Sequence, residues 1–145
     1  MGKLYPGPTR GTWTPVLTFA TPGDLSVVYS TRIGEWYLRD GILGLDFYFI
    51  ATTFTHTTAS GLLQITGLPF PSKTLASMQW AGRFAAMRGL TKATYTQFSP
   101  IQTSNSSVLS VLAIGSGLTE SLITSVEIPT GTVKVFGGQI SYPVG

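Results

Sequence analysis

Short runs of strand-forming residues, separated by turn signals, constrain this chain more than any other feature. The runs are rich in Val, Ile, Thr, Tyr, Phe and Trp, which pack well on a pleated, half-buried surface. Glycine accepts a positive φ, and proline fixes φ and removes an amide donor, so these residues mark turns. The turn signals lie at residues 6–8, 22–24, 40–41, 60–61, 67–69, 104–105, 129–131 and 137–138. This spacing predicts an all-β chain.

The run Ile42–Thr55 is the longest of the expected strands. Alternation places Leu43, Leu45, Phe47 and Phe49 on one side and Ile42, Gly44, Asp46, Tyr48 and Ile50 on the other. Both sides are largely apolar, which indicates burial of one side in the core and of the other at a subunit contact. The remaining expected strands cover residues 12–19, 25–32, 35–38, 62–66, 77–90, 108–114, 132–136 and 139–143.

The expected strand over residues 77–90 and the expected hairpin at the end of the chain each depend on glycines. Residues 77–90 contain alanines and a helical spacing of large apolar residues, but Gly82 and Gly89 interrupt it, so a strand is preferred to a helix. The last two strands are expected to form a hairpin through Gly137-Gly138, a pair that suits a tight turn.

The composition favours a folded domain. Hydrophobic residues make up 43% of the 145 residues and charged residues 10%, the opposite of a disordered chain. We expect one domain over residues 11–145, preceded by an extended Pro/Gly-rich arm over residues 1–10. The start of the chain has no apolar segment typical of a signal peptide. No run reaches the ~18 apolar residues of a membrane helix, and we expect no membrane partner.

Chemical sites are poorly supported by the residues available. The chain has no Cys and one His, His56, in a polar turn, whereas a zinc site needs three or four ligands. Neither a Gly-x-Ser-x-Gly elbow nor a Gly-Lys-Ser/Thr phosphate loop occurs. The formal charge of +3 comes from scattered cations rather than a basic stripe. We therefore expect no metal, no cofactor and no nucleic-acid partner.

Asp46 is the one acid placed inside an apolar strand, where an unpaired carboxylate is costly. The preferred interpretation is a pair with Arg32, Arg39 or Arg83, within or between subunits. The alternative makes Asp46 a catalytic acid, but no motif places a second acid beside it.

Long stretches of the chain carry no charge, and residues 93–119 are an example. The centres of protein–protein interfaces are depleted in charge and enriched in aromatic residues and Met. The pattern therefore predicts a stable oligomer.

Three ordered motifs resemble a module of tailed-bacteriophage virion proteins. They are Gly11-Thr12-Trp13-Thr14-Pro15, then Gly34-Glu35-Trp36-Tyr37, then residues 61–71 with Gly67-Leu68-Pro69-Phe70-Pro71. The segment 137–142 is similar to the closing strand of that family. The module occurs at the tips of tail fibres and spikes and in head fibres and decoration proteins. The resemblance implies an antiparallel β-sandwich, jelly-roll-like and homotrimeric, with no chemistry of its own.

Because the module begins by residue 11, we expect neither the shaft nor the attachment domain of long fibre proteins. This leads us to expect a capsid decoration (cement) protein, made in the host cytoplasm and bound as a trimer to the outside of the head, where it stabilises the capsid. The major capsid protein would then be the partner, contacted by the arm. The residues expected in that contact are Lys3, Leu4, Tyr5 and Arg10. Those expected to anchor the core or the trimer are Trp13, Phe47, Phe49, Leu68 and Phe70.

Two further classes remain open from the sequence. A receptor-binding tip of a tail fibre or spike would contact host glycan or surface protein through aromatic residues at loop tips, with Trp36, Tyr37 and Tyr95 as candidates. An enzyme that depolymerises glycans would need a pair of carboxylates, which no motif supplies. The sequence therefore favours a protein that is not an enzyme.

Overall fold

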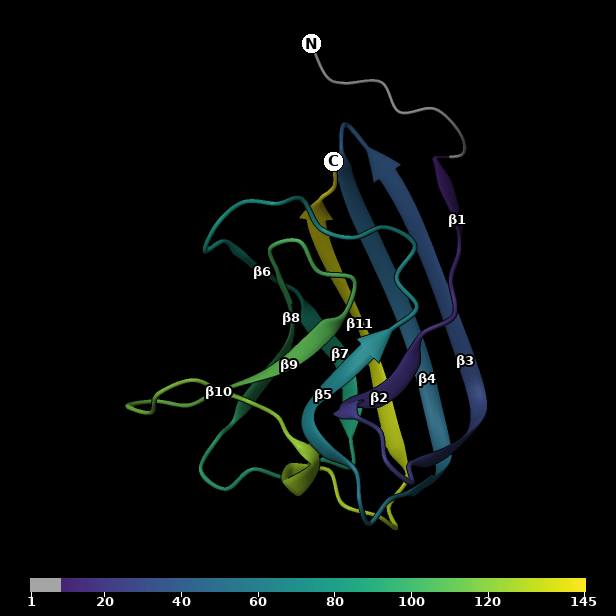
Figure 1. The fold of residues 1–145 in the computed structure, drawn as a ribbon, viewed down its shortest axis with the longest axis vertical. Coiled ribbons are helices and arrows are strands. Elements are labelled where there is room, and N and C mark those ends of the chain that lie inside the picture. Colours follow the sequence, from purple (N-terminus) through teal and green to yellow (C-terminus); the bar gives the residue numbers. More distant parts are fainter. Residues whose placement is uncertain (1–8) are drawn as a thin grey trace.

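A computed structural model of the chain, which describes residues 9–145, shows two antiparallel sheets packed face to face (Figure 1). The first sheet has the order β1 (Arg10–Thr12), β3 (Ser26–Arg39), β4 (Ile42–Thr55), β11 (Lys134–Pro143) and β7 (Arg83–Arg88). The second has the order β2 (Val16–Thr21), β5 (Ser60–Thr66), β9 (Leu109–Ile114), β8 (Gln97–Thr103) and β6 (Gln79–Ala81). The short β10 (Ser121–Leu122) pairs with β9, and a 3-10 turn, η1, covers Ser125–Glu127. The expected antiparallel β-sandwich is confirmed.

The β3–β4 hairpin contains the two longest strands of the first sheet. Its turn is Asp40-Gly41, whose φ values of 50° and 78° are those of a type I′ turn. This turn matches the right-handed twist of the two strands, which stay paired from Arg39 opposite Ile42 to Ser26 opposite Thr55. The predicted bounds of the long strand, Ile42–Thr55, are confirmed.

The core lies between the two sheets. Leu43, Leu45, Phe47 and Phe49 of β4 are buried on its inner side, as the alternation predicted. They pack with the inner residues of the second sheet, among them Leu17, Phe19, Leu63 and Ile65. Burying each large apolar side chain contributes ~1.5–3 kcal/mol, so this layer supplies most of the driving force for folding.

The expected hairpin at Gly137-Gly138 is wrong, because these residues lie in the middle of the continuous strand β11. Gly137 is needed there for close packing: a Cβ at this position would lie 2.5 Å from Cδ2 of Tyr48. The pairing of β11 with β7 shifts register between the two glycines, which marks a bulge. A pair of glycines can therefore mark a closely packed strand as well as a turn.

Other boundaries also differ. Residues 12–19 divide into the end of β1 and most of β2, separated around Thr14-Pro15, because the chain changes sheets there. Residues 35–38 belong to the long β3, and β8 and β10 were not expected. Residues 77–90 do form strand, in two pieces that meet at Gly82. In residues 9–145 the structure has no helix with the length and apolar character needed to cross a bilayer.

Candidate interaction surface

The outward side of β3, β4, β11 and β7, called here the outer face, is the candidate functional surface. Strand alternation places Ile33, Glu35 and Tyr37 of β3 on this side, because Trp36 and Leu38, which alternate with them, are buried in the core. In register beside them are Tyr48, Asp46 and Gly44 of β4, then Gly137, Gln139 and Ser141 of β11. The outer face therefore spans four hydrogen-bonded strands in the positions that the long-strand pattern assigned to a subunit contact.

Two tyrosine rings lie against glycines of neighbouring strands on the outer face. A Cβ on Gly44 would come within 2.0 Å of Cζ of Tyr37, and a Cβ on Gly137 within 2.5 Å of Cδ2 of Tyr48. Glycine is therefore required at both positions for the rings to lie across the sheet. Both rings therefore lie over the glycine of the adjacent strand.

Large apolar side chains remain exposed on this surface. Ile33 is 56% exposed, Tyr37 47%, Ile42 42% and Tyr48 40%. Ile33 stands directly opposite Tyr48, so two of the four form one cross-strand pair. Grouped apolar residues of this kind are typical of surfaces that contact another macromolecule.

Asp46 has surroundings that differ from those expected. Its direct cross-strand neighbours are Glu35 and Gln139. Within residues 9–145 the only ion pair joins Lys92 to Glu127, at 3.0 Å, so the expected Asp46–Arg pair is wrong within one chain. A pair between subunits stays a prediction. Arg83 instead donates to Oε1 of Gln139 at 2.9 Å from Nη2, and Arg32 lies with its guanidinium 4.2 Å from the Tyr29 ring centroid.

Glu35 and Asp46 thus form a pair of like charges directly across two strands. Like charges in this position destabilise a sheet. Two shallow hollows of about 400 and 380 Å³ border the pair, and both are lined in part by Tyr37 and Asp46. The second acid that no motif could place therefore exists, on an open surface rather than in a closed cleft.

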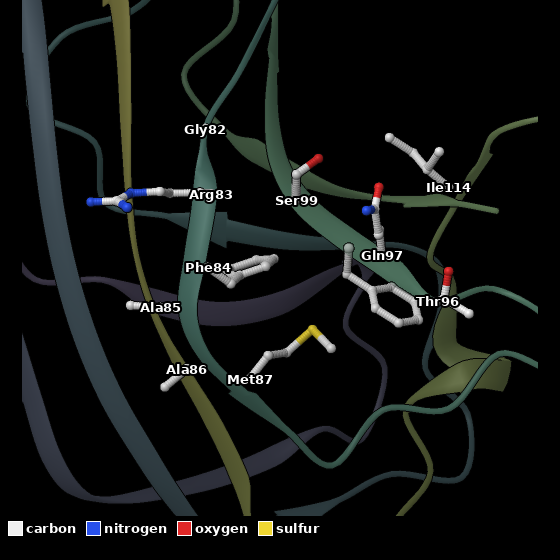
Figure 2. Close-up of a pocket in the computed structure, with 11 residues that line it drawn as sticks. Gly82, Arg83, Phe84, Ala85, Ala86, Met87, Thr96, Gln97, Ser99 and Ile114 are labelled. Atoms are coloured by element: carbon white, nitrogen blue, oxygen red, sulfur yellow. The ribbon is translucent and has the colours of Figure 1, made fainter. Parts of the chain in front are cut away.

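A separate apolar pocket of about 400 Å³ lies between β7 and β8 (Figure 2). Phe84 and Met87 of β7 point toward β8 (Figure 2), and Phe98 of β8 also lines the pocket. Figure 2 also shows Arg83 directed the opposite way, across β11 and toward the outer face. The pocket therefore belongs to the edge of the core, and Arg83 belongs to the outer face.

The five expected anchors all contribute to the core of one chain. Trp13, Phe47 and Phe49 are buried, and Nε1 of Trp13 donates to the backbone oxygen of Glu35 at 3.0 Å. Leu68 and Phe70 are half-buried and pack against the core from the corner after Gly67, whose φ is +93°. A trimer role for these five residues stays a prediction.

The residues expected to contact a receptor are not gathered at a loop tip. Trp36 is only 9% exposed and meets Phe70 edge-on at 5.3 Å, so its assignment as an exposed loop residue is wrong. Tyr37 is exposed, but it lies on the strand β3. Tyr95 is half-buried, and its hydroxyl donates to the backbone oxygen of Thr119 at 2.7 Å.

The arm expected over residues 1–10 falls largely outside the described residues, including Lys3, Leu4 and Tyr5. Arg10 is exposed and begins β1, opposite Tyr37. The last residue assigned to the arm is therefore part of the first sheet.

Sequence reasoning missed a buried cation. Lys134 has no exposed surface, and its Nζ donates to the backbone oxygen of Pro129 at 2.7 Å and to the hydroxyl of Thr132. Burial lowers the pKa of Lys134 from its ordinary value. Nearby, Nε2 of His56 lies 2.8 Å from the backbone oxygen of Ile128. This contact joins the end of β4 to the segment after η1. The alternation of β11, in which Lys134 shares a side with Phe136, was the available signal.

The comparisons with known proteins give one structural likeness. No protein-family model and no curated protein matches the sequence. The chain is similar to part of a crystal structure of the Dettilon tailspike protein (gp208), with a TM-score of 0.64 and 18% identity. The likeness covers 90% of this chain and 23% of the tailspike chain. This chain therefore shares its β-sandwich fold with about a quarter of a tailspike protein.

Proposed function

We propose that this chain is a non-enzymatic structural module of a tailed-phage virion, self-associating and carried on a tail spike or fibre. The observation that supports this proposal most is the likeness to a tailspike protein over 90% of the chain. The ordered motifs around Trp13, Trp36 and residues 67–71 support the virion part of the proposal independently, because they resemble virion proteins at the level of sequence.

The motif residues have structural tasks in the sandwich. Trp13 fastens β1 to the β3–β4 hairpin through its indole hydrogen bond, and it packs edge-on against Phe47 at 6.0 Å. Phe70 covers Trp36, which ties the 67–71 corner to β3. A motif whose residues bury aromatic rings and fix a corner specifies a scaffold, and a scaffold suits a mechanical role in a virion.

The finer prediction of capsid decoration has the resemblance alone as support, and the tail location has the structural likeness as well. Labelling the virion separates them. Gold-labelled antibodies against this chain, imaged by electron microscopy, are expected to mark the tail. Label on the head would replace our proposal by capsid decoration, and intact virions without any label would refute both.

The non-enzymatic part of the proposal has its own test, because Glu35 and Asp46 are adjacent carboxylates. Incubation of the purified protein with host surface polysaccharide is expected to release no reducing ends. Release that is abolished in Glu35→Gln/Asp46→Asn would show that the pair is catalytic and would contradict the proposal.

A further inference from the structure

We infer that the outer face is covered by a second copy of this chain, with the Glu35–Asp46 pair of one copy facing Arg83 and Arg88 of its neighbour. This inference rests on the self-association in the proposed function and names the surface that carries it. Three observations on the same four strands lead to it: exposed apolar side chains, two adjacent acids without an ion pair to residues 9–145, and a surface of sufficient size.

Several apolar side chains of the outer face are exposed to water in the single chain. Ile33 and Tyr48 are paired across β3 and β4, and Ile42 and Tyr37 extend the apolar surface toward the Asp40-Gly41 turn. Covering such side chains removes apolar area from water at ~25 cal/mol per Å². Val126 is more exposed, at 82%, but it lies on η1, away from the outer face.

The charged residues of the outer face indicate that a second copy of the chain covers it. Glu35 and Asp46 lie side by side in the middle of the outer face, and no cation of residues 9–145 pairs with either. Arg83 and Arg88 stand on β7 at the edge of the same face, in register with Gln139 and Val135 of β11. The other arginines near this face are Arg39, at the Asp40-Gly41 turn, and Arg10 of β1, which lines a hollow with both acids and makes no ion pair with them. A face with acids at its centre and guanidiniums at its edge is complementary to a shifted copy of itself. Opposite charges brought together across an interface would also relieve the repulsion between Glu35 and Asp46.

The outer face is similar in size to known interfaces. Four strands at ~4.8 Å spacing and ~3.3 Å rise per residue, over the 10 residues of β11, give a flat area of roughly 600 Å². Standard interfaces bury ~800 Å² of accessible surface per partner, which a flat area of this order provides once side-chain relief is counted. The rings of Tyr37 and Tyr48 lie over Gly44 and Gly137, so they contribute apolar area across β4 and β11.

The first experiment measures mass by light scattering after size exclusion. The wild-type chain is expected to exceed its 15.5 kDa monomer mass at micromolar concentration, and Ile33→Asp is expected to weaken association by at least ~10-fold. The matched control is Val126→Asp, an exposed apolar residue off the outer face, which is expected to assemble as the wild type does. Circular dichroism of each variant verifies that the sandwich is folded.

The second experiment tests the charge pairing. Glu35→Lys/Asp46→Lys replaces both acids of the outer face by cations, and Arg83→Glu/Arg88→Glu replaces both arginines of β7 by acids, while Arg39 of β3 is unchanged in each. Each variant alone is expected to be monomeric, and a mixture of the two is expected to form complexes that contain both, identified by native mass spectrometry. Rescue by mixing distinguishes charge pairing from simple loss of folding.

Three results would overturn the inference. A folded Ile33→Asp variant that assembles like the wild type would place the contact elsewhere and leave self-association intact. Charge variants that fail to combine when mixed would remove the facing of acids and guanidiniums. A monomeric wild type would remove self-association itself, whereas the virion location is decided separately by antibody labelling.

Discussion

Lys134 is a charged residue whose side chain is fully buried. An ammonium group without exposed surface loses its hydration, and here only a backbone oxygen, a hydroxyl and the Phe54 ring at 5.3 Å replace it. Burial therefore lowers the pKa of Lys134 below its ordinary 10.5. The folded chain releases this proton at a lower pH than the unfolded chain does.

This difference predicts a pH dependence. Below the folded-state pKa of Lys134 the wild type carries the full cost of the buried charge, and the cost declines as the pH rises toward 10.5. The free energy of unfolding of the wild type, relative to Lys134→Met, is therefore expected to increase between pH 7 and about pH 10. Urea unfolding at each pH measures it, with the exposed Lys73→Met as control. A constant difference between wild type and Lys134→Met would contradict this expectation.

Asp24 has the reverse behaviour. The Thr57 hydroxyl, together with the backbone amides of Thr58 and Thr57, donates to its carboxylate and holds the pKa of Asp24 far below 3.8. These bonds join the Pro22–Asp24 turn to residues 57–58, at the end of the sandwich opposite the Asp40-Gly41 turn.

Because the bonds favour the charged carboxylate, their contribution to stability is complete above pH 3.8 and is lost as the pH falls through the lowered pKa. Asp24→Ala is therefore expected to be less stable than the wild type at pH 7, with the difference shrinking in acid. Urea midpoints from neutral to acidic pH measure this. Asp40→Asn, which keeps a residue suited to the type I′ turn, serves as control, and a difference that persists unchanged in acid would be the contrary result.

At the scale of elements, the corner between β6 and β7 decides how the two sheets meet. β6 belongs to the second sheet and β7 to the first, and Gly82 alone separates them. Its amide donates to the backbone oxygen of Pro100 at 2.9 Å. A Cβ at Gly82 would lie 2.0 Å from the backbone oxygen of Gln139. The crossing therefore depends on a residue without a side chain.

Gly82→Ala is accordingly expected to lower the free energy of unfolding by ~1–3 kcal/mol, because the backbone of β11 has to move. Denaturant unfolding followed by circular dichroism measures the loss. Gly145→Ala is the control, since a Cβ there meets nothing within 4 Å. An unchanged midpoint for Gly82→Ala would contradict this expectation, because the backbone around residue 82 would then accommodate a Cβ without loss of stability.

At the scale of the whole molecule, charge and apolar surface are unevenly distributed. The chain has nine Lys and Arg and six Asp and Glu, and five of these residues lie on the outer face with exposed Ile33 and Tyr48: Glu35, Arg39, Asp46, Arg83 and Arg88. The inner side of the first sheet is covered by the second sheet within one chain. The outer side has no cover from residues 9–145 of the same chain.

Association that covers the outer face makes stability depend on concentration. The melting temperature of the wild type is expected to rise between ~1 and ~100 μM protein, because binding stabilises only the folded chain. Ile33→Asp is expected to show no such rise. Differential scanning calorimetry measures both, and a wild-type melting temperature independent of concentration would argue against a folded-state oligomer.

The sequence by itself determined the strand-rich class, the Asp40-Gly41 turn, the bounds of Ile42–Thr55 and the alternation that buries Phe47 and Phe49. These are local properties, because φ preferences and a period of two residues act within one strand. Tertiary structure decided the rest. Gly137-Gly138 became a strand because Tyr48 lies across it, Trp36 became core because β3 continues through it, and Asp46 met Glu35 rather than arginine. Such outcomes depend on which strands become neighbours and in which register, and no local pattern of residues carries that information.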